Sequence, residues 1–252
     1  MGFPKMQPFL WYNSNMSVFA SIGIVVLAML IMASLQLVPG VFAIFFHYAH
    51  GKYSFKKASR FSLFFILGSE IISALLFIAS FYISYTLFLN DLNPRNNILT
   101  WIFTGIFFAL SIACFFFYYR HPHSKDDTQL FISRKLAQTL DSRAKSSKTP
   151  SDAFTLGALS NICELPITLP LYIITATEIM YMHTEYFADD AMTILYILAS
   201  SIPLIYLYWR FRIGQNLAII QRSRIKDKTF SRFAISFSFL TIAILIICFR
   251  IV

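Results

Sequence analysis

The chain has 252 residues, of which 57% are hydrophobic and only 13% are charged. A soluble domain carries about 25% charged residues, so this composition excludes an ordinary soluble fold and indicates a membrane protein. The formal net charge of +9 does not indicate nucleic-acid binding, because the basic residues gather in a few loops between apolar runs.

Apolar runs long enough to cross a bilayer recur along the chain. A membrane-spanning helix needs about 20 mostly apolar residues. The runs are rich in Phe, Ile and Leu, and they lack the alternation that is typical of a membrane strand. They lie at residues 18–46, 61–89, 98–119, 153–180, 191–209 and 233–251. The sequence therefore predicts an all-α integral membrane protein with six transmembrane helices.

The distribution of basic residues predicts the orientation of these helices. Of the 21 Lys and Arg residues, 18 lie in the loops that follow the first, third and fifth runs. Loops that are rich in Lys and Arg stay in the cytoplasm. We therefore expect a multi-pass protein of the cytoplasmic membrane with both termini outside.

The six runs divide into two groups of three. Because each group contains an odd number of spans, the second would run inverted relative to the first, as in many small transporters. We predict a first three-helix half at residues 1–119 and a second at 153–252. A basic cytoplasmic loop, residues 120–152, lies between them.

This loop contains one further predicted element. Ile132, Leu136, Leu140 and Ala144 recur every four positions among basic residues, which predicts a short amphipathic helix on the inner membrane surface. Packing on the protein itself and contact with a partner protein are the alternatives. The loop ends in TPSD, residues 149–152, which predicts a helix start with its N-cap at Thr149.

The fourth run contains the unusual stretch NICELPITLP, residues 161–170. At 1.5 Å per residue, Glu164 lies about 18 Å from the start of the run, a little over halfway through a core of roughly 30 Å. Small and polar residues share one face of this helix, which must point at protein or water. They are Gly157, Ser160, Asn161, Glu164, Thr168, Tyr172 and Thr175.

Two prolines follow Glu164 closely. Pro166 and Pro170 lack an amide hydrogen, so the helix should kink or break beside the carboxylate. Irregular backbone at this depth survives only where it is buried in protein or lines a cavity. Broken helices at the midplane are a common way to build the binding site of a transporter.

A second carboxylate is predicted at a similar depth. Glu70 lies about 14 Å along the second run from Phe61, and the same run carries a stripe of serines suited to tight helix packing. No Lys or Arg lies in the first five spans to neutralise either glutamate. Each must be protonated, hydrogen-bonded to a group such as Asn161, or facing a mobile cation. Glu178, in contrast, should be solvated at the outer interface.

Proline motifs occur in the leading helix of each half. The first half has LVPG, residues 37–40, and the second has LPITLP, residues 165–170. In these motifs and in its architecture the chain resembles the lysine exporter (LysE) superfamily, including its peptidoglycolipid-addressing (GAP-like) and CcdA-type thiol-transfer branches. The resemblance implies six spans in two inverted halves and export of a solute. LVPG has no cysteine, which argues against thiol transfer.

These observations predict an exporter of a small polar or cationic solute. The alternative is a membrane protein that transports nothing and organises lipids or an envelope-assembly partner. The candidate substrate- or ion-binding residues are Glu164, Glu70, Asn161, Thr168, Pro166, Pro170, Pro39 and Gly40. We expect no catalytic residue, no enzyme activity, no metal site and no cofactor. The expected partners are membrane lipids and the solute or a coupling cation, and a homo-oligomer is compatible with the sequence.

Overall fold

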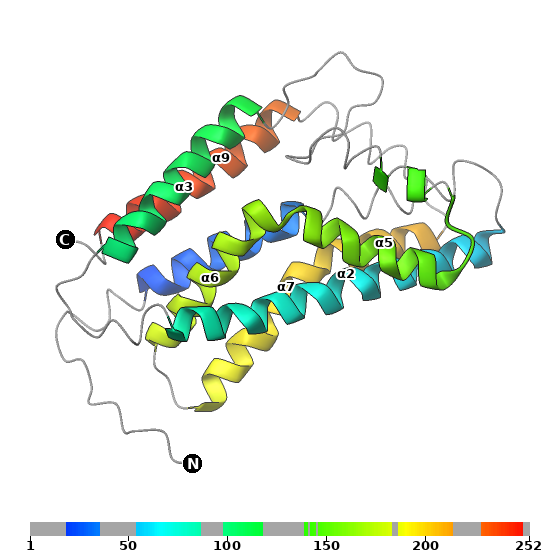
Figure 1. Cartoon of the computed structure of the whole chain (residues 1–252), viewed down its shortest axis with the longest axis horizontal. Helices are drawn as coiled ribbons and strands as arrows, with labels where there is room; N and C mark the ends of the chain where they lie inside the picture. Colours follow the sequence, from blue (N-terminus) through cyan, green and yellow to red (C-terminus); the bar gives the residue numbers. More distant parts are fainter. Residues whose placement is uncertain are drawn as a thin grey trace.

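The computed structural model of the chain is built of helices (Figure 1). It describes residues 19–35, 54–86, 98–117, 139–140, 142–144, 146–182, 186–213 and 228–248, and no strand occurs within these ranges. The long helices are the first helix (Phe19–Leu35), α2 (Phe55–Ser84), α3 (Ile98–Phe117), α5 (Pro150–Cys163), α6 (Leu165–Met182), α7 (Tyr186–Arg212) and α9 (Lys228–Ile246). Each predicted apolar run overlaps one of these helices, except that the run at 153–180 is divided between α5 and α6.

The prediction of an all-α protein with apolar helices is confirmed, whereas the number of membrane spans is not fixed by helix length. Among the described helices, α2 alone is long and apolar enough to cross a membrane. The count rises to three if the bent pair α5–α6 and the bent α7 each form one span. The first helix, α3 and α9 contain shorter apolar segments, so the six spans remain a prediction.

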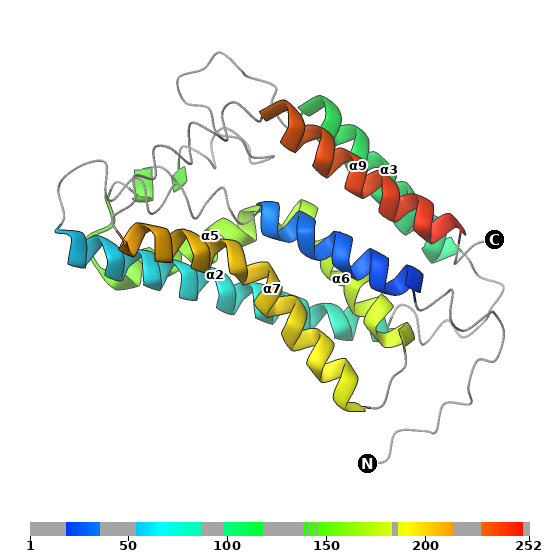
Figure 2. The same ribbon diagram turned by 180° about the vertical axis from the view of Figure 1, so that it is seen from behind.

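α2 and α5 run side by side in the same direction, as Figures 1 and 2 show. Their backbones touch where Gly68 of α2 lies opposite Gly157 of α5. A Cβ atom added at Gly68 would lie 2.1 Å from the carbonyl oxygen of Phe154, and one added at Gly157 would lie 2.1 Å from that of Phe65. Only glycine allows helices to approach so closely.

α7 packs against α2 in the opposite direction. The ring of Phe211 stacks on Phe55 at the start of α2, with ring centroids 5.3 Å apart. Farther along α2, Ser59 donates a hydrogen bond to the hydroxyl of Tyr208. Because residue numbers fall along α7 as they rise along α2, the two helices are antiparallel.

α3 and α9 form a second antiparallel pair, at the upper left of Figure 1. Phe115 packs edge-on against Phe233 near one end, and Phe107 stacks on Phe239 farther along. Between these contacts, the hydroxyl of Ser111 donates to the carbonyl of Ser236, and the hydroxyl of Ser236 donates back to the carbonyl of Ser111, both at 2.8 Å. The reciprocal bonds give the pair a local two-fold symmetry.

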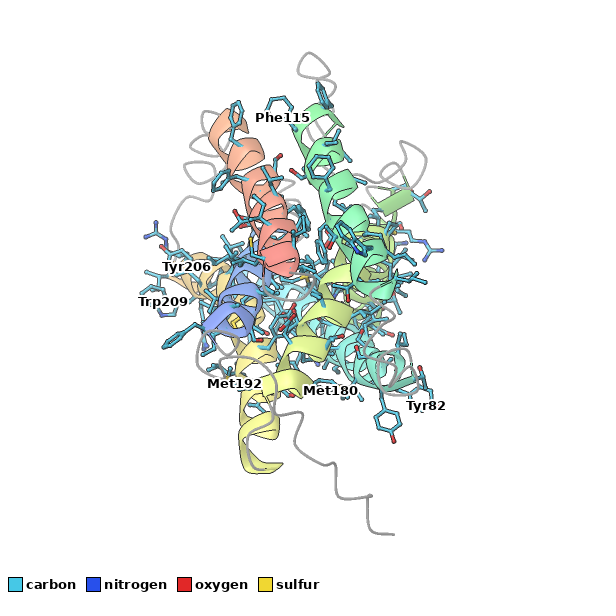
Figure 3. All side chains as sticks on the ribbon, turned by 90° about the vertical axis from the view of Figure 1, so that its left-hand side faces the viewer. Tyr82, Phe115, Met180, Met192, Tyr206 and Trp209 are labelled. Atoms are coloured by element: carbon cyan, nitrogen blue, oxygen red, sulfur yellow. The ribbon has the colours of Figure 1, made fainter. Side chains whose placement is uncertain are left out.

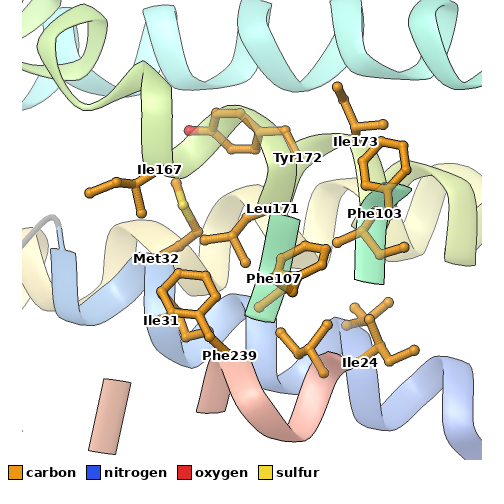
Figure 4. Packing of buried hydrophobic residues seen from close by; sticks show 14 of the residues in the cluster. Ile24, Ile31, Met32, Phe103, Phe107, Ile167, Leu171, Tyr172, Ile173 and Phe239 are labelled. Carbon is orange, nitrogen blue, oxygen red and sulfur yellow. The ribbon is translucent and has the colours of Figure 1, made fainter. Parts of the chain in front are cut away.

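The main hydrophobic core joins helices from both predicted halves. Ile24 and Met32 of the first helix pack with Phe107 of α3, Leu171 of α6 and Phe239 of α9 (Figure 4). All five side chains are at most 1% exposed. Helices from both predicted halves therefore contribute to one core among the described residues.

Many large apolar side chains are exposed on the described helices, as expected for helices in lipid. Trp101 near the start of α3 and Trp209 near the end of α7 are 53% and 57% exposed. In Figure 3 the side chains of Tyr82 and Trp209 project away from the helices. Exposed aromatic rings near helix ends suit the interface between lipid and water, where amphipathic rings are enriched.

The described end of the loop packs on the protein. Ala144 is buried and Leu140 is partly buried against a small core formed by α2, α5 and α7, which includes Phe65, Leu156 and Leu204. The predicted amphipathic helix thus directs these two residues toward the protein and not toward lipid. The contact supports self-packing among the three alternatives. Ile132 and Leu136 lie outside the described residues.

Candidate functional site

The chain turns sharply at Glu164. α5 begins as predicted: Thr149 is the N-cap, its side chain accepts a hydrogen bond from the amide of Asp152, and the carboxylate of Asp152 accepts one from the amide of Thr149. α5 ends at Cys163, α6 begins at Leu165, and the two helices are bent by 75°. The predicted break beside the carboxylate is therefore present.

The two prolines contribute to this break in different ways. Pro166 is the second residue of α6, where a missing amide hydrogen costs little because the first amides of a helix have no intrahelical partner. Pro170 lies inside α6, so the carbonyl of Pro166 loses its usual partner. The carbonyl of Glu164 is well satisfied, since it accepts hydrogen bonds from the amides of Ile167 and Thr168.

The small and polar face predicted across the fourth run is buried along its whole length. Glu164 is 4% exposed, and Thr168, Tyr172 and Thr175 are at most 1% exposed. Gly157, Ser160 and Asn161 are buried too. The face points at protein on both sides of the bend.

The serine stripe of α2 covers this face. Before the bend, the amide group of Asn161 donates hydrogen bonds to the carbonyl and the hydroxyl of Ser69, at 2.5 and 3.0 Å. After the bend, the hydroxyls of Ser73 and Tyr172 lie 2.6 Å apart and share a hydrogen bond. Near the far end of α2, Ser84 donates to the carbonyl of Ile173. One straight helix therefore holds both arms of a bent one.

Glu164 is buried at this junction and Glu70 of α2 is half-buried, and neither has a counter-charge among its described contacts. Oε1 of Glu164 is inaccessible to solvent and has no hydrogen-bond partner in the described part of the chain. Glu70 receives a hydrogen bond on Oε2 from the hydroxyl of Ser201 in α7, while its Oε1 is likewise buried without a described partner. An ionised carboxylate without a partner is very costly to bury. The buried carboxyl of Glu164 must therefore be neutral or bind a cation, whereas the half-buried carboxyl of Glu70 is less strongly constrained.

Tyr172 connects the surroundings of the two glutamates. Its hydroxyl lies within range of electrostatic interaction with both Glu164 and Glu70. In Figure 4 its ring lies on the side of α6 that faces α2, opposite to Leu171. The ring of Tyr196 packs edge-on against that of Tyr172, with centroids 6.4 Å apart. Both carboxyls therefore lie within electrostatic range of one tyrosine.

Two further buried hydroxyls continue this polar cluster. Tyr196 OH lies close to Thr175 Oγ1, but neither makes a hydrogen bond of good geometry to a described residue. An unsatisfied polar group in a protein interior costs about 1–3 kcal/mol. Groups held at that cost are expected where a ligand, an ion or a water molecule binds.

The other predicted site residues occupy different places. The amide group of Asn161 donates to Ser69 of α2 and not to a glutamate, so the interpretation that it hydrogen-bonds a carboxylate is not supported. The hydroxyl of Thr168 donates to the backbone carbonyl of Glu164 at 3.2 Å and stabilises the turn. Pro39 and Gly40 lie outside the described residues.

Glu178 differs from the sequence prediction. It is 1% exposed instead of solvated at an interface, and its Oε2 accepts a hydrogen bond of 2.6 Å from Ser21 of the first helix. The reason is that the buried face of α6 continues past Thr175 to Glu178, where Ser21 of the first helix contacts it. Position along a span did not indicate which face the carboxyl occupies.

No protein family, curated protein or solved structure that we compared with the chain matches it. The function must therefore be inferred from the site itself.

Two residues of the site were missed at the sequence level. Tyr196 and Ser201 both lie in α7, which bends by 41° between Met192–Ala199 and Ser201–Arg212. The sequence signal was Pro203 close to two serines of the same run. Like the prolines after Glu164, it indicates a bend in an apolar helix. Tyr196 reaches the cluster at Tyr172 of α6, and Ser201 reaches it at Glu70 of α2.

The arrangement is suited to binding protons or a single small cation. Carboxyl and hydroxyl oxygens converge from α2, α6 and α7, and burial strengthens any charge interaction among them. No group of three or more His, Cys, Asp or Glu side chains able to hold a metal ion occurs among the described residues. The chemistry available is reversible protonation and oxygen ligation.

Proposed function

We propose that the chain is a membrane transporter of the cytoplasmic membrane, and an exporter by its resemblance to the lysine exporter superfamily. Glu164 and Glu70 bind the small polar or cationic solute or its coupling cation. The observation that carries the proposal is a buried carboxyl, Glu164, beside a helix broken by 75°, together with the half-buried carboxyl of Glu70. Each has a buried oxygen that lacks a described partner. Buried ionisable groups in membrane helices usually mark a transport path.

The break supplies a reason for the position of Glu164. The carboxyl lies where the C-terminus of α5 meets the N-terminus of α6. The positive end of the α6 dipole favours the ionised carboxylate, and the carbonyl end of α5 favours a cation beside it. A bound cation would interact favourably with the Glu164 carboxylate and with the carbonyl end of α5. When the cation is released, the carboxylate must take up a proton.

Helix directions support six spans that alternate in direction. α2 runs parallel to α5 and antiparallel to α7, and α3 runs antiparallel to α9. These relations are those required if the spans alternate and the second half is inverted.

With both termini outside, a cysteine placed near Asp189 should react with an impermeant thiol reagent on intact cells, and one near Lys226 should not. The reverse pattern would refute this orientation.

Reconstitution in liposomes tests the function. We expect purified protein to allow proton flux under an imposed potassium diffusion potential, measured with an internal pH-sensitive dye, or counterflow of labelled lysine. Glu164→Gln should abolish the flux, because Gln keeps the shape of the side chain but cannot exchange a proton or neutralise a cation. Glu70→Gln should reduce it.

The control is Gly105→Ala on α3, where the added Cβ would meet no atom within 4 Å. This variant should transport like the parent. Vesicles with the parent protein that show neither flux nor counterflow would instead favour the alternative, a membrane protein that organises lipids or an assembly partner. Equal flux in the parent and in Glu164→Gln would remove Glu164 from the site.

A further inference from the structure

A third carboxyl is buried on the same helix face as Glu164, in a region to which the proposed transport site does not extend. Glu178 lies 14 positions after Glu164, about 21 Å along a helix. It is 1% exposed, and its Oε2 accepts the 2.6 Å hydrogen bond from Ser21. A glutamate this deep in apolar helices requires a reason other than solvation.

Hydroxyl groups occupy the interval between the two carboxyls. After Glu164, the buried face of α6 presents Thr168, Tyr172 and Thr175 before Glu178, at steps of three or four residues. Each step is about 4.5–6 Å along the axis. α2 and α7 add Ser73, 2.6 Å from the Tyr172 hydroxyl, and Tyr196, close to Thr175. All five hydroxyl residues are buried.

The hydroxyls in the middle of this row lack a hydrogen bond of good geometry. Tyr196 OH and Thr175 Oγ1 are both inaccessible to solvent and lie close to each other, but neither makes such a bond within the described part of the chain. Thr177, only two residues away and 3% exposed, is different, because its hydroxyl donates to Ser84 Oγ and to the carbonyl of Ile173. In the described part of α6, the unsatisfied hydroxyl thus lies on the face that joins the carboxyls.

We propose that Glu178 is a second protonation site, connected to Glu164 by a relay of buried hydroxyls formed by Thr175, Tyr196 and Tyr172. This inference rests on the proposed function, and it extends the path from the bend to the far end of α6. A hydroxyl can accept one hydrogen bond while it donates another. It can therefore pass a proton on without a net change in its own charge.

The relay moves protons only. A proton binds the Glu178 carboxylate from the side of the membrane at the end of α6. It is released to Thr175, and each hydroxyl then accepts one proton and donates another, with water bridging gaps too long for a direct hydrogen bond. One proton arrives at the Glu164 carboxylate when that group has lost its own to the solute path. No other group is oxidised, reduced or transferred.

Proton flux in liposomes tests the relay without a known solute. Glu178→Gln keeps the acceptor for Ser21 but cannot exchange a proton, so we expect the flux to fall by about a hundredfold, as for loss of a positioned proton-transfer group. Tyr196→Phe and Thr175→Val keep shape and packing. They should slow the flux by about tenfold, because water can partly replace a hydroxyl.

The matched control is Thr177→Val, which changes a buried threonine on the same helix outside the row. It should lower stability slightly and leave the flux unchanged. Thermal unfolding of each variant in detergent shows whether a loss of flux reflects misfolding. If Glu178→Gln does not fold, the flux of the conservative Tyr196→Phe and Thr175→Val variants decides whether the relay exists.

The possible results separate the two proposals. Loss of flux in Glu164→Gln together with parent-like flux in Glu178→Gln, Tyr196→Phe and Thr175→Val would overturn the relay and leave the transport site standing. If the parent protein shows lysine counterflow but no proton flux, the relay is likewise overturned and the transport site remains. Loss of flux in Thr177→Val equal to that in Thr175→Val would also overturn the relay. If the parent protein shows no proton flux and no lysine counterflow, both proposals are overturned.

Discussion

The helix pairs α2–α5 and α3–α9 are both closely packed, but they achieve contact with different parts of the chain. Between α2 and α5, backbone meets backbone at Gly68 and Gly157, and a polar side chain, Asn161, bonds the backbone of the neighbouring helix. Between α3 and α9, side chains meet: phenylalanine rings pack on each other around one reciprocal pair of serines.

The backbone contact between α2 and α5 is therefore rigid, whereas the side-chain contact between α3 and α9 can adjust. A ring can change rotamer or tilt when a neighbour changes, whereas a carbonyl oxygen in a helix cannot move without the helix. The carboxyl site is built on the rigid pair, since Glu70 follows Gly68 by two residues and Glu164 follows Gly157 by seven. We infer that α2 and α5 hold the site as one body, and that adjustment occurs elsewhere.

The largest predicted effect comes from adding a methyl group to the rigid contact. Gly68→Ala places a Cβ at 2.1 Å from the Phe154 carbonyl oxygen, so the helices must separate, at a cost of about 3 kcal/mol or more. Gly157→Ala should behave alike. The measurement is reversible unfolding in mixed micelles.

The matched control for these variants is Gly105→Ala on α3. Because its Cβ meets nothing within 4 Å and alanine favours the helix, it should be neutral or stabilise the protein by up to about 1 kcal/mol. If Gly68→Ala were as stable as Gly105→Ala, the two pairs would not differ in rigidity.

An intermediate effect is expected from the polar contact of the same pair. Asn161→Ala removes both hydrogen bonds to Ser69 and should destabilise the protein by about 1–3 kcal/mol. Ser69→Ala removes only the hydroxyl acceptor and should cost less, since the bond to the Ser69 carbonyl remains. Unfolding measurements on the two variants give the ratio. A larger loss for Ser69→Ala would mean that the backbone contact contributes little.

The smallest effect is expected in the pair held by side chains. Ser111→Ala removes one of the two reciprocal bonds to Ser236, and interhelical hydrogen bonds in membranes contribute about 0.6 kcal/mol on average. A double-mutant cycle with Ser236→Ala should give a coupling energy of that size. A coupling well above it would show that polar groups lock this pair as well, and the contrast with α2–α5 would disappear.

Local sequence rules predicted the start and the break of the bent helix well. Thr149 and Asp152 satisfy each other within four residues, so their hydrogen bonds need no tertiary context. The break after Glu164 follows likewise from covalent chemistry, because proline has no amide hydrogen. The burial of the face that includes Tyr172 followed from helical periodicity alone.

Contacts between distant helices could not be predicted in this way. That Ser201 of α7 would bond Glu70, and that Tyr196 would lie beside Thr175, depends on how α7 is placed against α2 and α6. Glu178 shows the same limit, since its depth along α6 suggested solvation while the covering first helix decided its burial. The two prolines looked equivalent in sequence, and only the position of the bend put Pro166 in the first turn of α6.

The reciprocal hydrogen bonds of Thr149 and Asp152 fix the residue at which α5 begins. Asn161 lies twelve positions after Thr149, and Glu164 lies three positions farther, so the cap sets both the depth and the angular position of the carboxyl. One residue inserted between them would turn every later side chain by about 100° and advance it by about 1.5 Å. The carboxyl would then leave the face covered by α2. The number of residues in α5 is therefore as strictly specified as the identity of the residue at position 164.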